Sequence, residues 1–398
     1  MKKHLRLALA VFLGAALFTA CKKDKTSPAK QSLRPAINYS RLLDTSLKYN
    51  NTNTLFVDGS NASTIDLTTG NFRYRAFQGI NTYNNLWKTQ TLDATVMKNM
   101  FANTGSPFTA ITNPPPADFA ALNASGVQLR NVTASSLPAA EAEAVRVKIE
   151  ADFTELARIS AFRDIPASEG VAGYVTNAAA SRTLVDEKGF ELTQVIQKGL
   201  IGAFDLDYIS NVLLNTGLDA DNYTLVSGKN YTKLEQNWDE AYATLTLNPV
   251  YLKGSTDVVR GTAESFIGSY IWEYNKANYA NIFPAFLKGR AAIVNNDATE
   301  YKTQALFIRT QMEKAIAGAA LGYLGKWKLG TDEGTRAHAI GEGLGFIYSL
   351  RFAKIHGANA AFSDAILSAL VGSEGGYWDL TNDKINAAEA AIKAKFGL

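Results

Sequence analysis

His338 and Glu342 are the residues whose types and spacing best suit chemistry in this sequence. They occur in the stretch GTRAHAIGEGLGFIYSL, residues 334–350. Because they are four positions apart, a helix would place both side chains on one face, about one turn from each other. An imidazole and a carboxylate so placed can bind a divalent ion such as iron or zinc, or another polar ligand. The alternative is a buried hydrogen bond between the two side chains in a tightly packed pair of helices.

Three glycines interrupt the same expected helix, at Gly341, Gly343 and Gly345. A glycine inside a helix costs about 1 kcal/mol relative to alanine, so three within five residues need a compensating reason. Gly341 and Gly345 fall on the face that carries His338 and Glu342. We therefore expect a neighbouring helix, or a ligand, to approach that face unusually closely.

A second polar surface is predicted on a helix within residues 186–204. One of its faces combines carboxylate, amide and ammonium groups, from Glu187, Glu191, Gln194 and Lys198. Such a stripe either faces solvent or forms the wall of a polar cavity between helices. In the second case Glu191 and Gln194 are candidate ligand-binding residues.

The segment NWDEAYATL, residues 237–245, supplies one more candidate. Trp238 and Tyr242 lie on its apolar face and are expected in the core, whereas Asp239 and Glu240 point elsewhere. Glu240 is a candidate ligand-binding carboxylate, although an acidic pair on a helix usually faces solvent.

Enzyme motifs are not evident, and we predict that the protein is not an enzyme. A zincin helix needs a second histidine four residues after the first and a glutamate beside the first. Here Glu342 takes the place of the second histidine and Ala339 the place of the glutamate. No nucleophile elbow, phosphate loop or dinucleotide fingerprint occurs in a plausible context. His356 would lie roughly 27 Å from His338 on a continuous helix, at a helix end before Gly357.

The N-terminus carries a lipoprotein signal. A short basic start is followed by an apolar run over residues 7–18 and then by Cys21, the only cysteine. This order is typical of a secretory signal, and the run is shorter than the roughly 20 residues of a membrane-spanning helix. Ala20-Cys21 resembles a bacterial lipobox, with Phe18 in place of the usual leucine. We predict an acylated Cys21 that anchors the chain to a membrane; an ordinary cleaved signal is the alternative.

The charge balance disfavours a nucleic-acid partner. The chain of 398 residues has 40 Lys and Arg against 37 Asp and Glu. The signal contains Lys2, Lys3 and Arg6 and no acidic residue, so the mature chain has 37 of each sign. Nucleic-acid binding needs clustered basic residues to neutralise phosphates, and no such cluster is present in the sequence.

The spacing of apolar residues predicts an all-α protein with few or no short strands. We assign residues 1–20 to the signal, 21–36 to the acylated cysteine and a flexible tether, and 37–398 to a large helical-bundle domain. Asp297 and Glu300 fit a capping box at the start of one helix. The expected helices cover residues 72–101, 139–162, 189–215, 231–245, 258–274, 297–328, 331–356, 363–371 and 381–396, and the strand candidates are 55–57 and 223–226.

Three of these segments resemble the markers of a lipoprotein family of unknown function that is common in Bacteroidota. They are KGFELTQVIQKGLIGAF, NWDEAYATL and RAHAIGEGLGFIYSL. More distantly, that family is similar to imelysin-like proteins, which are helical envelope proteins with two bundle-like halves linked to iron uptake. The resemblance implies this fold for the present chain.

The match to the imelysin motif Gly-x-His-x-x-Glu is partial. His338 corresponds to the motif histidine, but Arg336 stands in place of the glycine and Gly341 in place of the acid. Glu342 is one position further on, which turns the carboxylate by about 100° around the helix. The metal geometry of imelysins therefore does not transfer directly to this chain.

These observations give two hypotheses of different classes. The first is a lipid-anchored, non-catalytic binding protein of the Gram-negative envelope that takes iron, zinc or a metal chelate at His338 and Glu342. It would be an outer-membrane lipoprotein on the periplasmic or the surface face. The second is a structural lipoprotein without a small-molecule site, whose partner is an outer-membrane transporter or surface complex.

Overall fold

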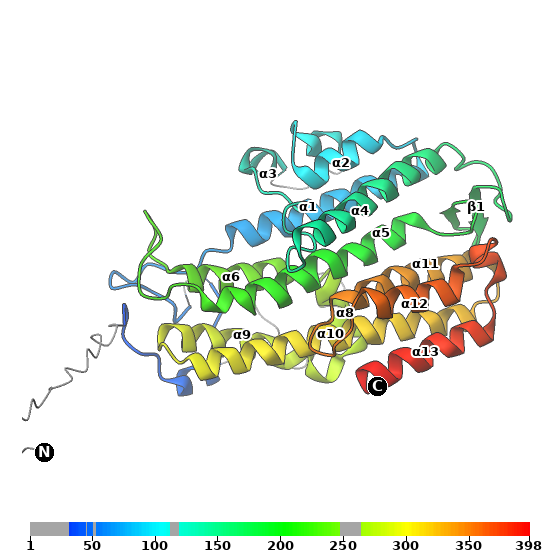
Figure 1. The fold of residues 1–398 in the computed structure, drawn as a ribbon. Coiled ribbons are helices and arrows are strands. Elements are labelled where there is room, and N and C mark those ends of the chain that lie inside the picture. The colour runs from blue at the N-terminus through cyan, green and yellow to red at the C-terminus, as the bar shows by residue number, and fades with distance from the viewer. Residues whose placement is uncertain (1–31, 45, 51–52, 112–118, 247–263) are drawn as a thin grey trace, which may run out of the picture. The chain divides into compact units, whose positions relative to one another are not determined.

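The protein is built almost entirely from helices that pack around one apolar core (Figure 1). The computed structural model describes residues 32–44, 46–50, 53–111, 119–246 and 264–398. Residues 32–398 form one compact unit. The predicted all-α class is confirmed. None of the helices in these ranges is long and apolar enough to cross a membrane.

Within the described residues, the secondary structure consists of α-helices joined by short 3₁₀ turns, one π-helix and one small sheet. The first half of the chain contains α1 (Thr68–Asn84), α2 (Ala94–Ala102), α3 (Phe119–Ser125), α4 (Ala139–Ser160), β1 (Gly173–Thr176), β2 (Arg182–Val185) and α5 (Leu192–Leu200). The π-helix η4 (Ile201–Leu213) continues directly from α5. The second half contains α6 (Lys233–Leu245), α8 (Phe266–Tyr274), α9 (Lys276–Val294), α10 (Ala298–Leu329), α11 (Glu333–Ser349), α12 (Ala360–Val371) and α13 (Asn382–Phe396). The 3₁₀ turns are η1 (Tyr39–Leu43), η2 (Asn85–Lys88), η3 (Pro107–Ala110), η5 (Thr216–Asp219), η6 (Leu350–Phe352) and η7 (Gly376–Asp379).

Capping explains where two of the helices begin. Asp297 accepts a hydrogen bond from the backbone N–H of Glu300 at 3.0 Å, as predicted for the start of α10. The other half of the predicted box does not form, because the Glu300 carboxylate instead pairs with Lys288 at 2.9 Å. The predicted helix over 72–101 is divided in two, since Asp93 caps a new helix, α2, by accepting from the N–H of Thr95.

The strand predictions were wrong in position. Residues 55–57 and 223–226 contribute only single bridges, Val57 with Ser63 and Leu225 with Thr232. The antiparallel pair of β1 and β2 lies instead in a stretch without helical spacing between α4 and α5. Isolated two-residue bridges close tight loops here, whereas the true hairpin pairs four residues on each side.

Helix α11 is placed by its neighbours α5 and α10, which both pack along it; Figure 1 shows α11 beside α5. It ends at Ser349, so the prediction of a helix that continues to His356 was wrong. The chain turns away through η6, and His356 is held by α10: its Nδ1 lies 2.7 Å from Glu313 Oε2. His356 therefore does not share a helix with His338.

The last residues of the predicted tether contact the helical unit. Ser32 Oγ donates to the carbonyl of Val294, and the Arg34 guanidinium pairs with Glu235. Both backbone groups of Ile37 bond to the side chain of Asn295. Cys21 and the rest of the tether lie outside the described residues.

Candidate functional site

The candidate site is centred on His338, whose imidazole lies between two carboxylates. Asp332 caps α11 by accepting from the N–H of Thr335 at 2.7 Å, and this fixes the first turn two residues before the site. His338 Nδ1 lies 2.7 Å from Glu191 Oε2, and its Nε2 lies 3.1 Å from Glu342 Oε1. The structure thus brings together three of the predicted site residues, two from α11 and one, Glu191, from the N-cap position of α5.

The two carboxylates stabilise the charged form of the ring. The hydrogen bond to Glu191 is the larger effect and that to Glu342 the second, and together they raise the pKa of His338 to about 10 against the opposing effect of burial. The ring therefore carries a proton on each nitrogen at neutral pH. The His338 side chain remains 46% exposed, whereas Glu191 and Glu342 are buried.

Close packing of α5 against α11 makes this arrangement possible, as the glycine pattern predicts. A Cβ atom at Gly341 would lie 2.9 Å from the Cβ of Glu191, and one at Gly345 would lie 2.5 Å from the Cβ of Lys198. Real Cβ atoms do not approach so closely. The third glycine differs, because a Cβ at Gly343 would lie 3.7 Å from its nearest neighbour, on Tyr323.

A buried lysine completes the charge balance around Glu342. Lys198 Nζ lies 3.6 Å from Glu342 Oε2, and Tyr270 Oη donates to the same oxygen at 3.4 Å. Burial lowers the pKa of Lys198, and the nearby Glu342 and Glu191 only partly offset this effect. Burial also acts to raise the pKa of Glu342, but the hydrogen bond from His338 and the charge of Lys198 outweigh it and hold that pKa below its usual value.

The cluster opens into a cavity of about 350 Å³. His338 and Glu342 form part of its wall, together with Tyr323, Lys326 and Thr335. Pockets of this size are large enough for small-molecule ligands. A ligand in the cavity would reach the Nε2 side of the ring, because Glu191 lies at Nδ1.

The predicted residue Gln194 lies beside this cluster, and Glu240 lies apart from it. The Cβ of Gln194 is 3.5 Å from the Cβ position built at Gly341, and its side-chain oxygen is buried without a hydrogen-bond partner among the described residues. Glu240 instead pairs with Arg73 at 2.8 Å and accepts from Tyr208 at 2.9 Å. The polar stripe of 186–204 is thus partly buried, since Glu191 and Lys198 face helix α11 and not solvent.

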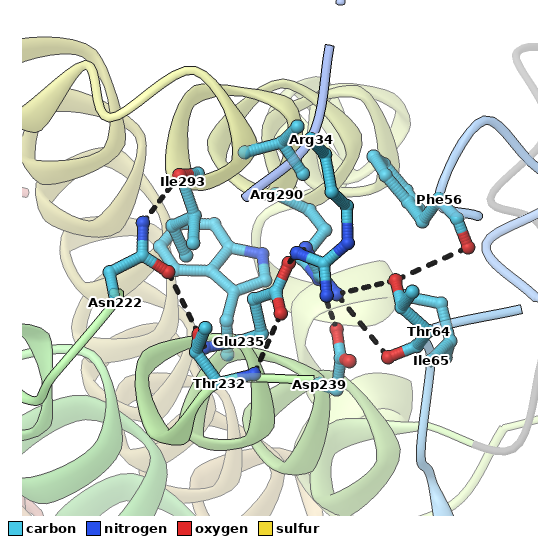
Figure 2. Close-up of polar contacts among 12 residues, drawn as sticks. Arg34, Phe56, Thr64, Ile65, Asn222, Thr232, Glu235, Asp239, Arg290 and Ile293 are labelled. Atoms are coloured by element: carbon cyan, nitrogen blue, oxygen red, sulfur yellow. Dashed lines mark hydrogen bonds and ion pairs between the residues drawn. The ribbon is translucent and has the colours of Figure 1, made fainter. Parts of the chain in front are cut away.

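A second cluster of charges, which the sequence did not indicate, surrounds Arg290 (Figure 2). Its Nη1 lies 2.7 Å from Glu235 Oε1, and its Nε lies 2.9 Å from Asp239 Oδ1. Glu235 also closes a capping box with Thr232 at the start of α6. The side chains of Arg290, Glu235 and Asp239 are completely buried.

Arg34 and Tyr49 add further contacts to the two carboxylates of the Arg290 cluster. Arg34 adds a second guanidinium to Glu235, and Tyr49 donates to Asp239 Oδ1 at 2.9 Å (Arg34 in Figure 2). Burial raises the pKa of Asp239 to about 7, although the Arg290 charge opposes the shift. Burial also acts to raise the pKa of Glu235, but Arg290 and Arg34 outweigh it, so this pKa stays below its usual value. Asp239 and Glu240, the acidic pair expected at the surface, are therefore both buried.

Comparison with known proteins places the chain in one family. A family model described as "Domain of unknown function (DUF4856)" matches residues 52–398. Since the match covers most of the sequence, the chain belongs to this family. Neither the curated proteins nor the solved structures that were compared gave a match.

Proposed function

We propose that this DUF4856 protein is a lipid-anchored, non-catalytic binding protein of the bacterial envelope, and that it takes a divalent metal such as iron or zinc at His338. One observation carries the proposal. The imidazole has one nitrogen held by Glu191 while the other faces Glu342 and an open cavity.

The donor set fits a metal on the Nε2 side of the ring. Histidines that bind metals usually donate their other ring N–H to a carboxylate, which fixes the orientation of the ring. The 2.7 Å contact between His338 Nδ1 and Glu191 has this form. Nε2 of His338 and Oε1 of Glu342, 3.1 Å apart, are then the two atoms that would bind the ion. The ion would have to displace the proton on Nε2, so binding would release a proton and strengthen as the pH rises.

The ligands that fill the remaining coordination positions of the metal must come from outside the protein. Among the described residues, no group of three or more His, Cys, Asp or Glu side chains is placed to hold a metal ion. A structural zinc site has four protein ligands, whereas a site with open positions exchanges water or ligand. With two protein ligands and a 350 Å³ cavity, the site suits an exchangeable ion or a metal chelate that brings its own donors.

The anchor and the location belong to the same proposal. The basic start, the apolar run and the Ala20-Cys21 pair support acylation of Cys21. Outer-membrane localisation, on the periplasmic or surface side, and a role beside envelope transport proteins follow from the resemblance to imelysin-like lipoproteins. Globomycin treatment and mass spectrometry of the mature N-terminus test the anchor: an unmodified Cys21 would exclude it.

A structural or interaction lipoprotein is the second candidate, and the charge balance of the site favours it. Glu191 and Glu342 are matched by the cations His338 and Lys198 within the cluster. A cluster whose charges cancel in this way can fix the relative position of α5 and α11 without any ligand. On this reading the partner is another envelope protein, and crosslinking followed by pull-down would identify it.

Metal titration of the untagged, chelator-treated protein separates the two candidates. We expect one equivalent of Zn²⁺ or Fe²⁺ to bind, with Fe²⁺ added anaerobically. Glu191→Gln keeps both direct donors and removes the orienting carboxylate, so it should weaken binding about 10- to 100-fold. His338→Gln should weaken binding further.

His356→Gln is the matched control, because His356 also pairs with a buried glutamate at 2.7 Å but is only 15% exposed. It should bind metal like the wild type. Equal, substoichiometric binding by the wild type and His338→Gln would end the metal proposal and leave the structural one.

A further inference from the structure

A second and larger cavity, of about 740 Å³, lies between α4, the end of α11 and the start of α12. His338 and Glu342 are not part of its wall. The apolar side chains of Leu137, Val145, Tyr348 and Leu367 contribute to its lining. Small, exposed side chains leave this space open: Ala144 on α4 and Ala361 on α12 both line it. We call this space the α4/α12 groove.

Three cations line this groove, together with Glu141, Asn359 and Asp364. The guanidinium carbon of Arg351 lies 3.7 Å from the centre of the Tyr348 ring, and Lys148 Nζ lies 5.1 Å from it. Lys354 is the third. A mainly apolar lining with a few placed polar groups is the usual character of a small-molecule site.

The cations differ in how far their charge is already neutralised. Arg351 pairs with Asp364 at 2.5 Å, and Lys148 pairs with Asp152. The Lys354 ammonium instead donates to the hydroxyl of Ser136 at 2.7 Å and to its carbonyl at 3.2 Å, both neutral groups. Asp207 also interacts with the Lys354 charge, but it is buried and accepts hydrogen bonds from Ser136. Among the described residues no carboxylate pairs directly with Lys354, so it is the cation most available to an anionic ligand.

The start of α12 adds to the positive character of the same space. Ala360 and Ala361, which line the groove, are the first two residues of this helix of 12 residues. The first backbone N–H groups of a helix have no partner within it and carry a partial positive charge. The acidic groups that line the groove are Glu141 and Asp364, of which Asp364 is already paired with Arg351. The surroundings of Lys354 thus favour an anion.

We propose that the α4/α12 groove binds a fatty acid, with its carboxylate at Lys354 and its alkyl chain over Tyr348 and the apolar lining. Each methylene of the ligand that the apolar lining removes from water makes the binding free energy more favourable. The ammonium of Lys354 supplies the charge that distinguishes the acid from a neutral alcohol of equal length. This inference does not depend on the metal site.

Isothermal titration of the full mature protein with dodecanoate, below its micelle concentration, tests the proposal. We expect binding at one site, with dodecanol and dodecylamine at least tenfold weaker. Within the series octanoate, decanoate and dodecanoate, each added methylene should tighten binding by about fourfold, the factor expected for its full burial.

Variants locate the ligand in the groove. Lys354→Gln should weaken dodecanoate at least tenfold and leave dodecanol unchanged, while Lys302→Gln on α10 serves as the exposed-lysine control. Ala361→Phe should abolish binding of both ligands by filling the groove. Ala369→Phe, exposed on the same helix but not lining the groove, should have no effect. Equal affinity for dodecanoate and dodecanol, or full binding by Ala361→Phe, would overturn the proposal.

Discussion

The Arg290 cluster and the His338 cluster are both groups of buried charges between helices, yet they differ in access. Arg290, Glu235 and Asp239 have side chains that are 0% exposed. His338 keeps 46% of its side chain exposed, and its cavity reaches Glu342. One cluster is closed on every side by the protein, and the other has one open side.

This difference is the reason we assign a structural role to the Arg290 cluster and propose a binding role for the His338 cluster. A fully buried ion pair gains little net stability over apolar residues, but removing one of its partners leaves an uncompensated charge in the interior. The Arg290 cluster therefore acts through the integrity of the fold. In the His338 cluster, a ligand can replace a contact of the ring without entering the core, so changes there should affect binding more than stability.

Arg290→Met should give the largest effect. It removes the guanidinium from two fully buried carboxylates, and breaking such a pair costs about 3–5 kcal/mol of unfolding free energy. Urea unfolding followed by circular dichroism measures this loss. Arg34→Met is the comparison, because Glu235 then keeps Arg290, and we expect a loss of about 1–3 kcal/mol. A loss below about 1 kcal/mol for Arg290→Met would show that the cluster does not depend on its cation.

The pH dependence of stability should identify Asp239 as the titrating group of the closed cluster. Because burial raises its pKa to about 7, the folded protein still holds a proton that the unfolded chain releases near pH 4. The stability contributed by protonated Asp239 is therefore complete below about pH 4 and falls as the pH rises through 7.

Urea unfolding of the wild type and of Asp239→Asn, at pH 4.5 and at pH 7.5, tests this prediction. The variant does not titrate at this position. The wild type should lose on the order of 3 kcal/mol relative to the variant across this range. A constant difference would mean that Arg290 keeps Asp239 ionised throughout.

The sequence predicted contacts within helices better than contacts between them. The spacing of His338 and Glu342, and the glycines beside them, indicated a close helix approach, which Gly341 and Gly345 make against α5. The Arg290 cluster could not be predicted in this way. Arg290 is 51 positions from Asp239, and no helical period links residues so far apart.

The acidic pair of α6 illustrates the same limit. On spacing alone Asp239 and Glu240 were expected at the surface, but each finds a separate arginine, Arg290 and Arg73, from another helix. The strand predictions were wrong for a related reason. A hairpin with four residues in each strand depends on the pairing of two segments and not on a local pattern. Only tertiary packing decides such cases.

The glycines of α11 provide an intermediate test of the comparison. Gly345→Ala would place a Cβ 2.5 Å from Lys198 Cβ, and the forced shift of α5 should cost about 1–3 kcal/mol. Gly343→Ala is the matched control, because its nearest contact is an ordinary 3.7 Å and alanine favours the helix by up to about 1 kcal/mol. The unfolding temperature should therefore fall for Gly345→Ala and rise for Gly343→Ala. Equal shifts would show that the close approach is not required.

His338→Gln should have the smallest effect on stability and a large effect on binding. Glu342 keeps Lys198, and Glu191 keeps a hydrogen bond from Thr193, so neither buried carboxylate is left without a partner. Because the lost side chain is half exposed, we expect a change in unfolding free energy of about 1 kcal/mol or less. Urea unfolding and metal titration of the same preparation measure both quantities. A loss of stability as large as that of Arg290→Met would show that the His338 cluster, despite its open side, serves the fold in the same way as the closed one.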